Sequence, residues 1–457
     1  MNLVFALPCI LEESRIEYER IKKLSLGEKS FFPVEKVIHK GATVGNLLAH
    51  GDNLDFINYL CNQKNMEGKI QLIYMDPPFY SKANYEAAIK FNSDKVKDIP
   101  LIKPLAYKDS WQNGIEEYLK TICVRFYLMK DLLSDTGCFW VHLDWHVVHY
   151  VKILMDEIFG EKRFVNEVVW NYKSGGTGKR SFSKKHDTLL FYSKTKDYYF
   201  SPQKEKSYNR GFKPYRFKGV KEYKDDLGWY TMVNMKDVWP IDMVGRTSSE
   251  RTGYATQKPE ALLRRIVDSC SAPGDICADF FGGSATLASV CEKEGRRWIS
   301  CDIGGIATVN GLKRMSGKKS TFTLLQEGKT IEKKGKGEVN LEVTAKPIEF
   351  TEKKLITIRL KDYNIKSRDI PLVGKEKEKI KALVKKDPLK LIEYWSVDFS
   401  YDGNIHTPQM FFTKQDHQVI VECENIVKGD ECLSVRTVDV FGNSTFTLVD
   451  LGGGNDD

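Results

Sequence analysis

The sequence predicts an α/β fold built on a buried parallel sheet and followed by a small β-rich domain. Over about the first 325 residues, strand-like and helix-like segments alternate along the chain. The strand-like segments are apolar throughout rather than at every second residue, which is typical of a parallel sheet covered on both faces. Beyond that point, short β-like runs separated by turn residues replace the alternation.

The length and composition are those of a globular protein. The chain has 457 residues, of which 41% are hydrophobic and 29% charged, and its length corresponds to roughly two to four domains. No apolar run approaches the roughly 18 residues of a membrane span, and the N-terminus lacks the basic flank of a signal peptide. The ten cysteines include no C-x-x-C pair, so we expect reduced thiols in a cytoplasmic protein, without a structural zinc site.

The α/β part is expected to begin after a helical lead-in over residues 1–40, whose short helix at 11–24 is closed by Gly27 and Pro33. Spacing of apolar residues and turn signals then predict each element in order. The predicted strands are 43–48, 70–75, 138–143, 276–281 and 298–302. The predicted helices are a short helix that ends at 60, a helix at 118–133, a helix that is capped by Asp144 and ends at 159, and two helices at 259–270 and 285–294.

A Gly/Lys-rich stretch over 328–340 is expected to be a linker to the C-terminal domain, residues 341–457. Strands are predicted there at 341–343, 355–360, 419–423, 433–438 and 445–448. Their lengths and the turn signals between them favour a small β-sandwich with a frayed tail at 452–457.

The tetrapeptide Asp76-Pro77-Pro78-Phe79 stops a predicted strand at its carboxyl end, where α/β proteins bind ligands. Its parts suit methylation of an exocyclic amine, which is a poor nucleophile because its lone pair is delocalised into the base. The Asp76 carboxylate and a proline-fixed Pro77 carbonyl can accept the amine N–H groups, and Phe79 offers a face for an extruded base. The alternative is a plain strand-ending turn.

A second candidate site is the segment 279–286, in which a strand, a glycine turn and a helix follow one another. Such a turn lets the backbone approach a cofactor closely, and Asp302 at the end of the next strand is placed to bind ribose hydroxyls. This pattern indicates a nucleotide-like ligand. NAD is a weaker alternative because G-x-G-x-x-G is absent.

A basic block lies between these two sites. Residues 173–224 contain fifteen Lys and Arg against four acids, a net charge of +11, interleaved with aromatic residues. Basic groups neutralise phosphates and aromatic rings stack on bases, so the block favours a nucleic-acid partner over a merely solvated surface. The glycine-rich stretch 175–179 is not a P-loop because Arg180 replaces the required Ser or Thr, and we expect a DNA-contacting loop.

Four residues near position 145 have types that bind metals: His142, Asp144, His146 and His149. No fourth ligand of suitable spacing is evident beside the histidines. A packed strand–helix junction is therefore favoured over a metal site.

Three of these segments together resemble a known family. The segments 76–79, 279–286 and 256–260 (Thr-Gln-Lys-Pro-Glu) are similar to motifs IV, I and X of amino-group DNA methyltransferases. Their order, with the catalytic motif first and a basic insert in between, resembles the β-class, in particular the modification subunits of type III restriction systems and their stand-alone relatives. The further matches are 51–54, 107–111, 140–144, 154–160, 166–170 and 185–192.

The resemblance implies a permuted Rossmann-like fold that binds S-adenosylmethionine over residues 41–327. It divides this domain into a catalytic half at 41–170, a target-recognition region at about 171–250 and a cofactor half at 251–327. The residues implied to hold the target adenine are Asp76, Pro77, Pro78 and Phe79. Those implied to bind or lie near the cofactor are Asp52 at the adenosine end, Asp302 at the ribose, Phe281 and Gly283 at the methionine part near Lys258, and also Asp76 and Asp279.

The resemblance implies that the basic insert recognises DNA. The residues expected to contact it are Lys179, Arg180, Lys184, Lys185, Arg210, Lys213, Arg216 and Lys218. One departure from the family pattern is Ala285, which stands where the last glycine of F-x-G-x-G is usual.

The sequence therefore predicts a site-specific methyltransferase that acts on N6 of a flipped adenine in duplex DNA. The alternatives are an N4-cytosine or RNA adenine methyltransferase, or a non-catalytic DNA-binding subunit with a methyltransferase-like shell. A homodimer and a separate restriction subunit are possible partners.

Overall fold

The computed structural model describes residues 3–23, 30–42, 44–91, 101–174, 179–328, 336–415, 417–429 and 431–451. The glycine-rich loop at 175–178, most of the expected linker and the expected frayed tail lie outside these residues. In the described part of the chain, no helix is long and apolar enough to cross a membrane.

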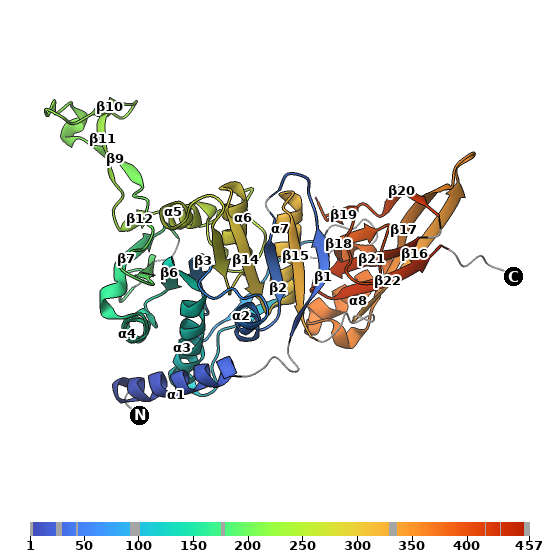
Figure 1. The fold of residues 1–457 in the computed structure, drawn as a ribbon, viewed down its shortest axis with the longest axis horizontal. Coiled ribbons are helices and arrows are strands. Elements are labelled where there is room, and N and C mark those ends of the chain that lie inside the picture. Colours follow the sequence, from blue (N-terminus) through green and yellow to red (C-terminus); the bar gives the residue numbers. More distant parts are fainter. Residues whose placement is uncertain are drawn as a thin grey trace.

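A ten-stranded sheet runs through the centre of the molecule (Figure 1). From edge to edge its strands are β1 (Phe31–Val37), β15 (Phe322–Glu327), β2 (Asn46–His50), β14 (Arg297–Asp302), β13 (Ile276–Asp279), β3 (Ile70–Met75), β6 (Leu133–Leu143), β8 (His186–Ser193), β7 (Phe164–Asn171) and β12 (Val238–Pro240). The six strands from β15 to β6 are parallel, whereas β1 and β8 pair with their neighbours antiparallel. The five strands predicted from the sequence all lie in this centre, so the expectation of a parallel sheet is confirmed for them, whereas the antiparallel flanking strands were not predicted.

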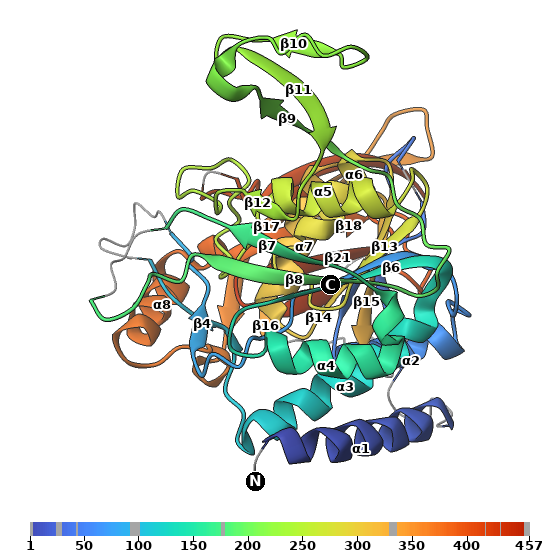
Figure 2. The ribbon, with the colours of Figure 1, turned by 90° about the vertical axis from the view of Figure 1, so that its left-hand side faces the viewer.

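Helices cover both faces of this sheet, as the apolar strands predict. One face packs against α1 (Leu3–Lys23), α2 (Asn53–Asn62), α3 (Gly114–Leu132) and α4 (Val148–Phe159). The other face packs against α5 (Glu260–Cys270), α6 (Thr286–Lys293) and α7 (Gly305–Gly317). Figure 2 shows the two helical layers below and above the sheet.

The helix expected at 11–24 is present as part of a longer helix, but the rest of the lead-in contains a strand that was not predicted. The helix α1 ends at Lys23, and Pro33 lies inside strand β1 instead of closing a helix. Proline is tolerated there because β1 is an edge strand and its register with β15 shifts between Pro33 and Glu35.

Two further boundaries differ from expectation. The helix α4 begins at Val148 and has no side-chain cap, because the Asp144 carboxylate instead accepts hydrogen bonds from the backbone and ring of His146. The strand expected at 419–423 begins only at Glu422.

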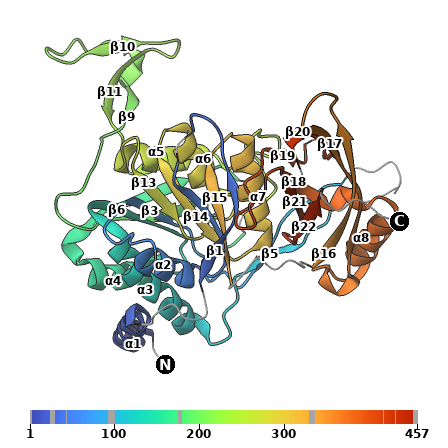
Figure 3. The same cartoon turned by 45° about the vertical axis from the view of Figure 1, so that its right-hand side comes forward.

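The C-terminal part consists of two sheets and a helix around one apolar core (Figure 3). The first sheet contains β16 (Gly337–Pro347), β17 (Lys353–Ile365) and β20 (Glu422–Lys428). The second contains β19 (Met410–Thr413), β18 (Ile392–Asp398), β21 (Cys432–Asp439) and β22 (Ser444–Asp450). Strand β18 and the helix α8 (Gly374–Lys386) were not predicted, and β16 already begins inside the stretch expected to be a linker.

This part is tied to the N-terminal edge of the central sheet. The carboxylate of Glu35 in β1 is fully buried and binds Arg436, Tyr394 and Ser396, three residues from β18 and β21. In addition, the turn after β21 lies against the start of α7, where a Cβ on Gly442 would come within 2.5 Å of the Gly305 backbone. The two parts therefore share a tightly packed interface.

A small three-stranded sheet projects from the body of the molecule (Figures 1 and 2). It consists of β10 (Glu222–Lys224), β11 (Trp229–Asn234) and β9 (Lys204–Tyr208). A shorter pair, β4 (Asn84–Glu86) and β5 (Leu105–Lys108), lies within the α/β part.

Candidate active site

A cavity of about 500 Å³ lies at the carboxyl ends of β3, β13 and β14. All of the predicted catalytic and cofactor residues line it, although they are spread over about 250 positions of the sequence. They are Asp52, Asp76, Pro77, Pro78, Phe79, Lys258, Asp279, Phe281, Gly283 and Asp302.

Asp76 follows the last residue of β3 and forms an ion pair with Lys258. The Lys258 Nζ lies 2.6 Å from Asp76 Oδ2, and both side chains are more than four-fifths buried. The other oxygen, Asp76 Oδ1, is buried and has no hydrogen-bond partner among the described residues. An acceptor that is desolvated and unsatisfied is costly unless a ligand donates to it, so this oxygen is available to an N–H group in the cavity.

The ring of Phe79 is supported from behind. It stacks on His142 with the ring centroids 5.8 Å apart, and Lys258 Nζ lies 5.3 Å from its centroid. His142 is itself fixed by two hydrogen bonds, one between Nδ1 and the Tyr74 hydroxyl (2.7 Å) and one between Nε2 and the Asp187 carboxylate (3.0 Å). The Phe79 ring is therefore held in a fixed orientation beside Asp76.

The backbone after Pro78 depends on Asp109, a residue that the sequence analysis did not single out. Its fully buried carboxylate accepts hydrogen bonds from the backbone N–H groups of Phe79, Tyr80 and Ser81 at 2.7–3.0 Å. It also accepts from the Ser81 hydroxyl and from Trp111 Nε1. Tyr80 has a left-handed φ of 59°, a conformation that these bonds stabilise.

The glycine turn after β13 lines the cavity and packs closely against Ser300 and Tyr254. A Cβ on Gly282 would lie 2.2 Å from Ser300 Oγ, and a Cβ on Gly283 would lie 3.1 Å from the ring of Tyr254. Ala285 adopts φ 56°, the left-handed region in which glycine is favoured. The departure from the family pattern thus preserves the shape of the turn at a cost in backbone strain.

Two carboxylates line the same turn, of which Asp279 is buried and Asp302 half-buried. Burial raises the pKa of Asp302, although its oxygens accept the N–H groups of Gly283 (2.8 Å) and Gly304 (2.7 Å). Burial also raises the pKa of Asp279 to about 8, and the neighbouring carboxylates of Asp76 and Asp302 act in the same direction. A cationic ligand beside these acids would relieve their burial.

Asp52 closes the cavity at the start of α2. Its carboxylate caps this helix by accepting the Leu54 N–H at 2.7 Å and lies 3.3 Å from Arg125. Its side chain keeps an exposed fraction of 37%, so it can still accept a hydrogen bond from a ligand.

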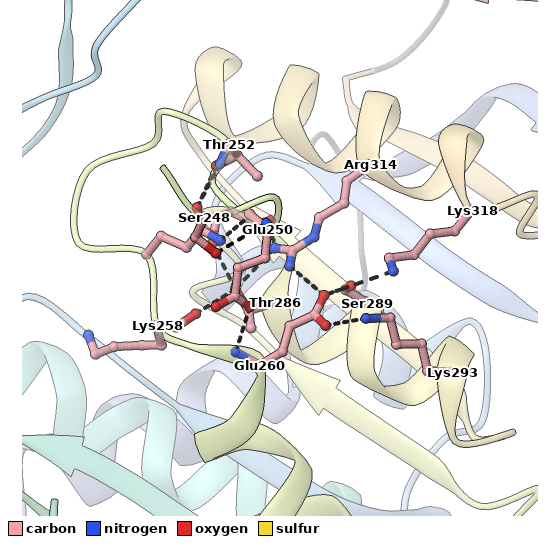
Figure 4. Close-up of polar contacts among 12 residues, drawn as sticks. Ser248, Glu250, Thr252, Lys258, Glu260, Thr286, Ser289, Lys293, Arg314 and Lys318 are labelled. Atoms are coloured by element: carbon pink, nitrogen blue, oxygen red, sulfur yellow. Dashed lines mark hydrogen bonds and ion pairs between the residues drawn. The ribbon is translucent and has the colours of Figure 1, made fainter. Parts of the chain in front are cut away.

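A polar network behind the cavity fixes the backbone on both sides of Lys258 (Figure 4). Arg314 donates to the Ser284 carbonyl (2.9 Å) and to Glu260 (2.8 Å), thereby joining α7 to the glycine turn and to α5. Thr286 Oγ1 donates to the Lys258 carbonyl. Figure 4 shows the Lys258 amino group pointing away from this network, which is consistent with its bond to Asp76.

The eight predicted DNA-contacting residues fall into two groups, because the buried strand β8 interrupts the basic block. Lys179, Arg180, Lys184 and Lys185 precede β8, and Lys184 Nζ lies 3.6 Å from the centroid of Trp145. Arg210, Lys213, Arg216 and Lys218 are exposed on the projecting sheet. Several exposed aromatic residues accompany them: Phe182, Phe212, Tyr215 and Phe217.

The metal-like cluster is not assembled in the structure. His142 faces Tyr74 and Asp187, whereas His146 binds Asp144, and the described residues contain no group of three potential ligands suited to a metal ion. The ten cysteines are free, and eight of them are buried.

Comparison with known proteins identifies the family. A family model for DNA methylases that modify N6 or N4 amino groups matches residues 70–305, which is more than half of the chain. The chain belongs to this family, whose enzymes use S-adenosylmethionine. The cavity fits that cofactor: it offers a glycine turn, carboxylates for hydroxyl and cationic groups, and a free buried acceptor.

Curated relatives include restriction-associated enzymes. The chain is 27% identical over 271 residues to the type II methyltransferase M.ScaI of Streptomyces caespitosus, covering 56% of this chain and 76% of that protein. It is 24% identical over 168 residues to the Mod subunit of the type III enzyme EcoP15I of Escherichia coli, covering 35% of this chain and 26% of that protein. A solved structure of an M1.HpyAVI–SAM complex covers 59% of this chain and 98% of its own, with 18% identity and a TM-score of 0.38.

Proposed function

We propose that this protein is a site-specific DNA methyltransferase that modifies N6 of an adenine flipped out of duplex DNA. The observation that carries the proposal is the Asp76–Lys258 pair. Lys258 occupies one carboxylate oxygen and leaves the other, Asp76 Oδ1, buried at the cavity and without a partner in the described part of the chain. This arrangement offers a preorganised acceptor to the amino group of a base.

The proposed chemistry requires little beyond positioning. S-adenosylmethionine supplies the electrophilic methyl group. Asp76 Oδ1 and the Pro77 carbonyl accept the N–H groups of the target amine, which favours a pyramidal nitrogen with its lone pair available for attack. Phe79, supported by His142, stacks on the extruded base, and Lys258 holds the Asp76 carboxylate in place.

The cofactor roles follow from positions around the cavity. Asp302, which already orders the turn through Gly283, would accept ribose hydroxyls. Phe281 and Gly283 would face the methionine part, with Asp279 nearby, and Asp52 would serve the adenosine end.

Adenine is proposed over cytosine because an aspartate, not a serine, precedes the two prolines, a pattern that the resemblance to the family associates with adenine. Methylation-aware sequencing of DNA from cells that express the protein tests this directly. We expect N6-methyladenine at one recurring sequence, and no modification with Asp76→Ala. The exposed Asp135→Ala serves as control. N4-methylcytosine in place of N6-methyladenine would overturn the choice of base.

By analogy with the Mod relatives, any restriction subunit would be a separate chain.

The proposed partner is duplex DNA held by the projecting sheet. If Lys213, Arg216 and Lys218 contact phosphates, replacing all three with alanine weakens DNA binding. It also lowers the salt slope by up to about 0.9 for each lost phosphate contact. Affinity for S-adenosylmethionine should not change. The matched control removes three exposed lysines of α8: Lys375, Lys385 and Lys386. A triple variant with wild-type DNA affinity and slope would refute the contact.

A further inference from the structure

A second cavity, of about 730 Å³, lies between the α/β part and the C-terminal part. Its wall comes from four separate regions: the segment after β4, the loop before Tyr254, one side of α7, and the strands β18 and β19 with their flanks. None of its lining residues belongs to the proposed catalytic or cofactor set.

The two cavities are neighbours separated by a thin partition. Tyr85, Tyr254 and Gly304 line the first, whereas Ala87, Gly253 and Ile306 line the second, so the same three chain segments bound both. Between them, Ala87, Tyr254, Ile306 and Ala307 pack into one small apolar cluster. The Ala88 N–H donates to the Gly253 carbonyl at 3.0 Å, which closes the partition.

The second cavity carries a strong positive charge. Among the residues that the structure describes, five basic side chains line it against a single acid: Lys90, Arg246, Arg251, Lys313 and Lys414 against Glu393. Lys313 and Lys414 both bind Glu393, so two ammonium groups share one carboxylate. The Lys414 side chain has an exposed fraction of only 5%, and burial lowers its pKa despite the attraction of Glu393.

The two arginines at the rim add to this charge. Arg246 and Arg251 are exposed, and within the described ranges neither has an acidic side chain at ion-pair distance. A concentration of like charge is costly unless an anion binds, so the cavity is built to receive phosphate-like groups. Arginine suits this task because its guanidinium contacts phosphate oxygens in a bidentate manner.

We infer that this cavity binds backbone phosphates of the DNA beside the flipped base. The inference rests on the proposed function and extends it, because it makes the C-terminal part a second DNA-holding element. Phosphates flank every base in the duplex, and a base that enters the first cavity brings them next to the partition. The projecting sheet would then hold one side of the target and the second cavity the other.

The first experiment measures duplex binding as a function of salt for the double variant Arg246→Ala/Arg251→Ala. Loss of two phosphate contacts lowers the salt slope by about 1.8, so wild-type affinity falls about tenfold more than that of the variant between 50 and 200 mM salt. Affinity for S-adenosylmethionine stays unchanged. The control Lys346→Ala/Lys353→Ala removes two exposed charges from the β16–β17 hairpin and leaves the slope as it is.

The second experiment compares duplexes trimmed from either side of the methylated base. Trimming the duplex on one particular side of the target base removes the difference in salt slope between the wild type and the double variant. The reason is that the phosphates that would bind in the cavity are then missing. A difference that persists with either trimmed duplex would overturn the inference.

Two outcomes separate the inference from its premise. If the wild type binds and methylates DNA but the double variant keeps the wild-type slope, the inference fails while the proposed function stands. If the wild type does neither, the proposed function itself fails. In a third outcome, the wild type binds deoxyadenosine monophosphate and the double variant fails to bind it, while both bind DNA equally well. That result would assign the cavity to a free nucleotide and overturn the assignment to DNA.

Discussion

Asp109 offers a sharp test of how the catalytic turn is held. In Asp109→Asn, one carboxylate oxygen becomes an NH2 group of the same size. Oδ1 accepts two hydrogen bonds and Oδ2 accepts three, so at least two buried donors lose their acceptor whichever way the amide turns. At about 1–3 kcal/mol for each unsatisfied donor, the variant loses about 2–6 kcal/mol.

The loss has two readouts. Thermal unfolding should shift down by at least about 4 °C, since about 1 kcal/mol corresponds to about 2–4 °C for a domain of 150–250 residues. Methyl transfer should fall by about 100-fold or more, because a displacement of about 1 Å at Phe79 is enough for that. Affinity for S-adenosylmethionine should change little, because Asp109 does not line the cavity.

The control is Asp402→Asn, an exposed turn residue whose carboxylate accepts only local hydrogen bonds such as that from Asn404. It should stay within about 0.5 kcal/mol of the wild type. An Asp109→Asn protein that unfolds at the wild-type temperature and methylates at the wild-type rate would refute the role given to this carboxylate.

Three further outcomes are expected. Asp302→Ala should weaken S-adenosylmethionine binding by about 1–3 kcal/mol in calorimetry, and unchanged affinity would move the ribose contact elsewhere, first to Asp52. Because the pKa of Asp279 is raised in the fold from 3.8 to about 8, its contribution to stability is full below pH 3.8 and is lost as the pH rises towards 8. Asp279→Asn should flatten this decline of the free energy of unfolding in urea experiments at different pH values. A pH profile identical to that of the wild type would contradict the prediction. Ala285→Gly should keep the free energy of unfolding within about 1 kcal/mol of the wild type, because relief of about 1–2 kcal/mol of left-handed strain offsets the lost methyl group. Ala288→Gly, inside the helix α6 that Ala285 precedes, should cost more than about 1.5 kcal/mol. Equal losses in the two variants would argue against strain at position 285.

The sequence predicted the centre of the fold and the candidate site because both depend on local patterns. Each strand of the parallel centre is a continuous apolar run, and the site residues stand where such runs stop. Parallel strands end at one edge of the sheet, so Asp76, Asp279 and Asp302 come together without any knowledge of the loops.

What the sequence did not predict depends on contacts between distant residues. Asp109 acts on backbone groups 28–30 positions away, and only its place in a family-like stretch, 107–111, could have drawn attention to it. Strand β1 was missed because Pro33 reads as a helix or strand terminator, and only the edge position makes it acceptable. The second cavity combines segments from positions 87 to 440, which no local pattern can reveal.

The burial of Glu35 has a consequence for how the protein is made. Arg436, which neutralises this residue, follows it 401 positions later in the chain, so Glu35 leaves the ribosome long before its partner. At about 5–20 residues per second, synthesis of the intervening chain takes about 20–80 s. Strand β1 also waits for β15 throughout most of this time, and the Glu35 carboxylate remains without Arg436 until β21 has been translated. A fragment that ends before β15 would therefore expose an unpaired strand, whereas one that ends between β15 and β21 would pair this strand but leave its carboxylate without the arginine.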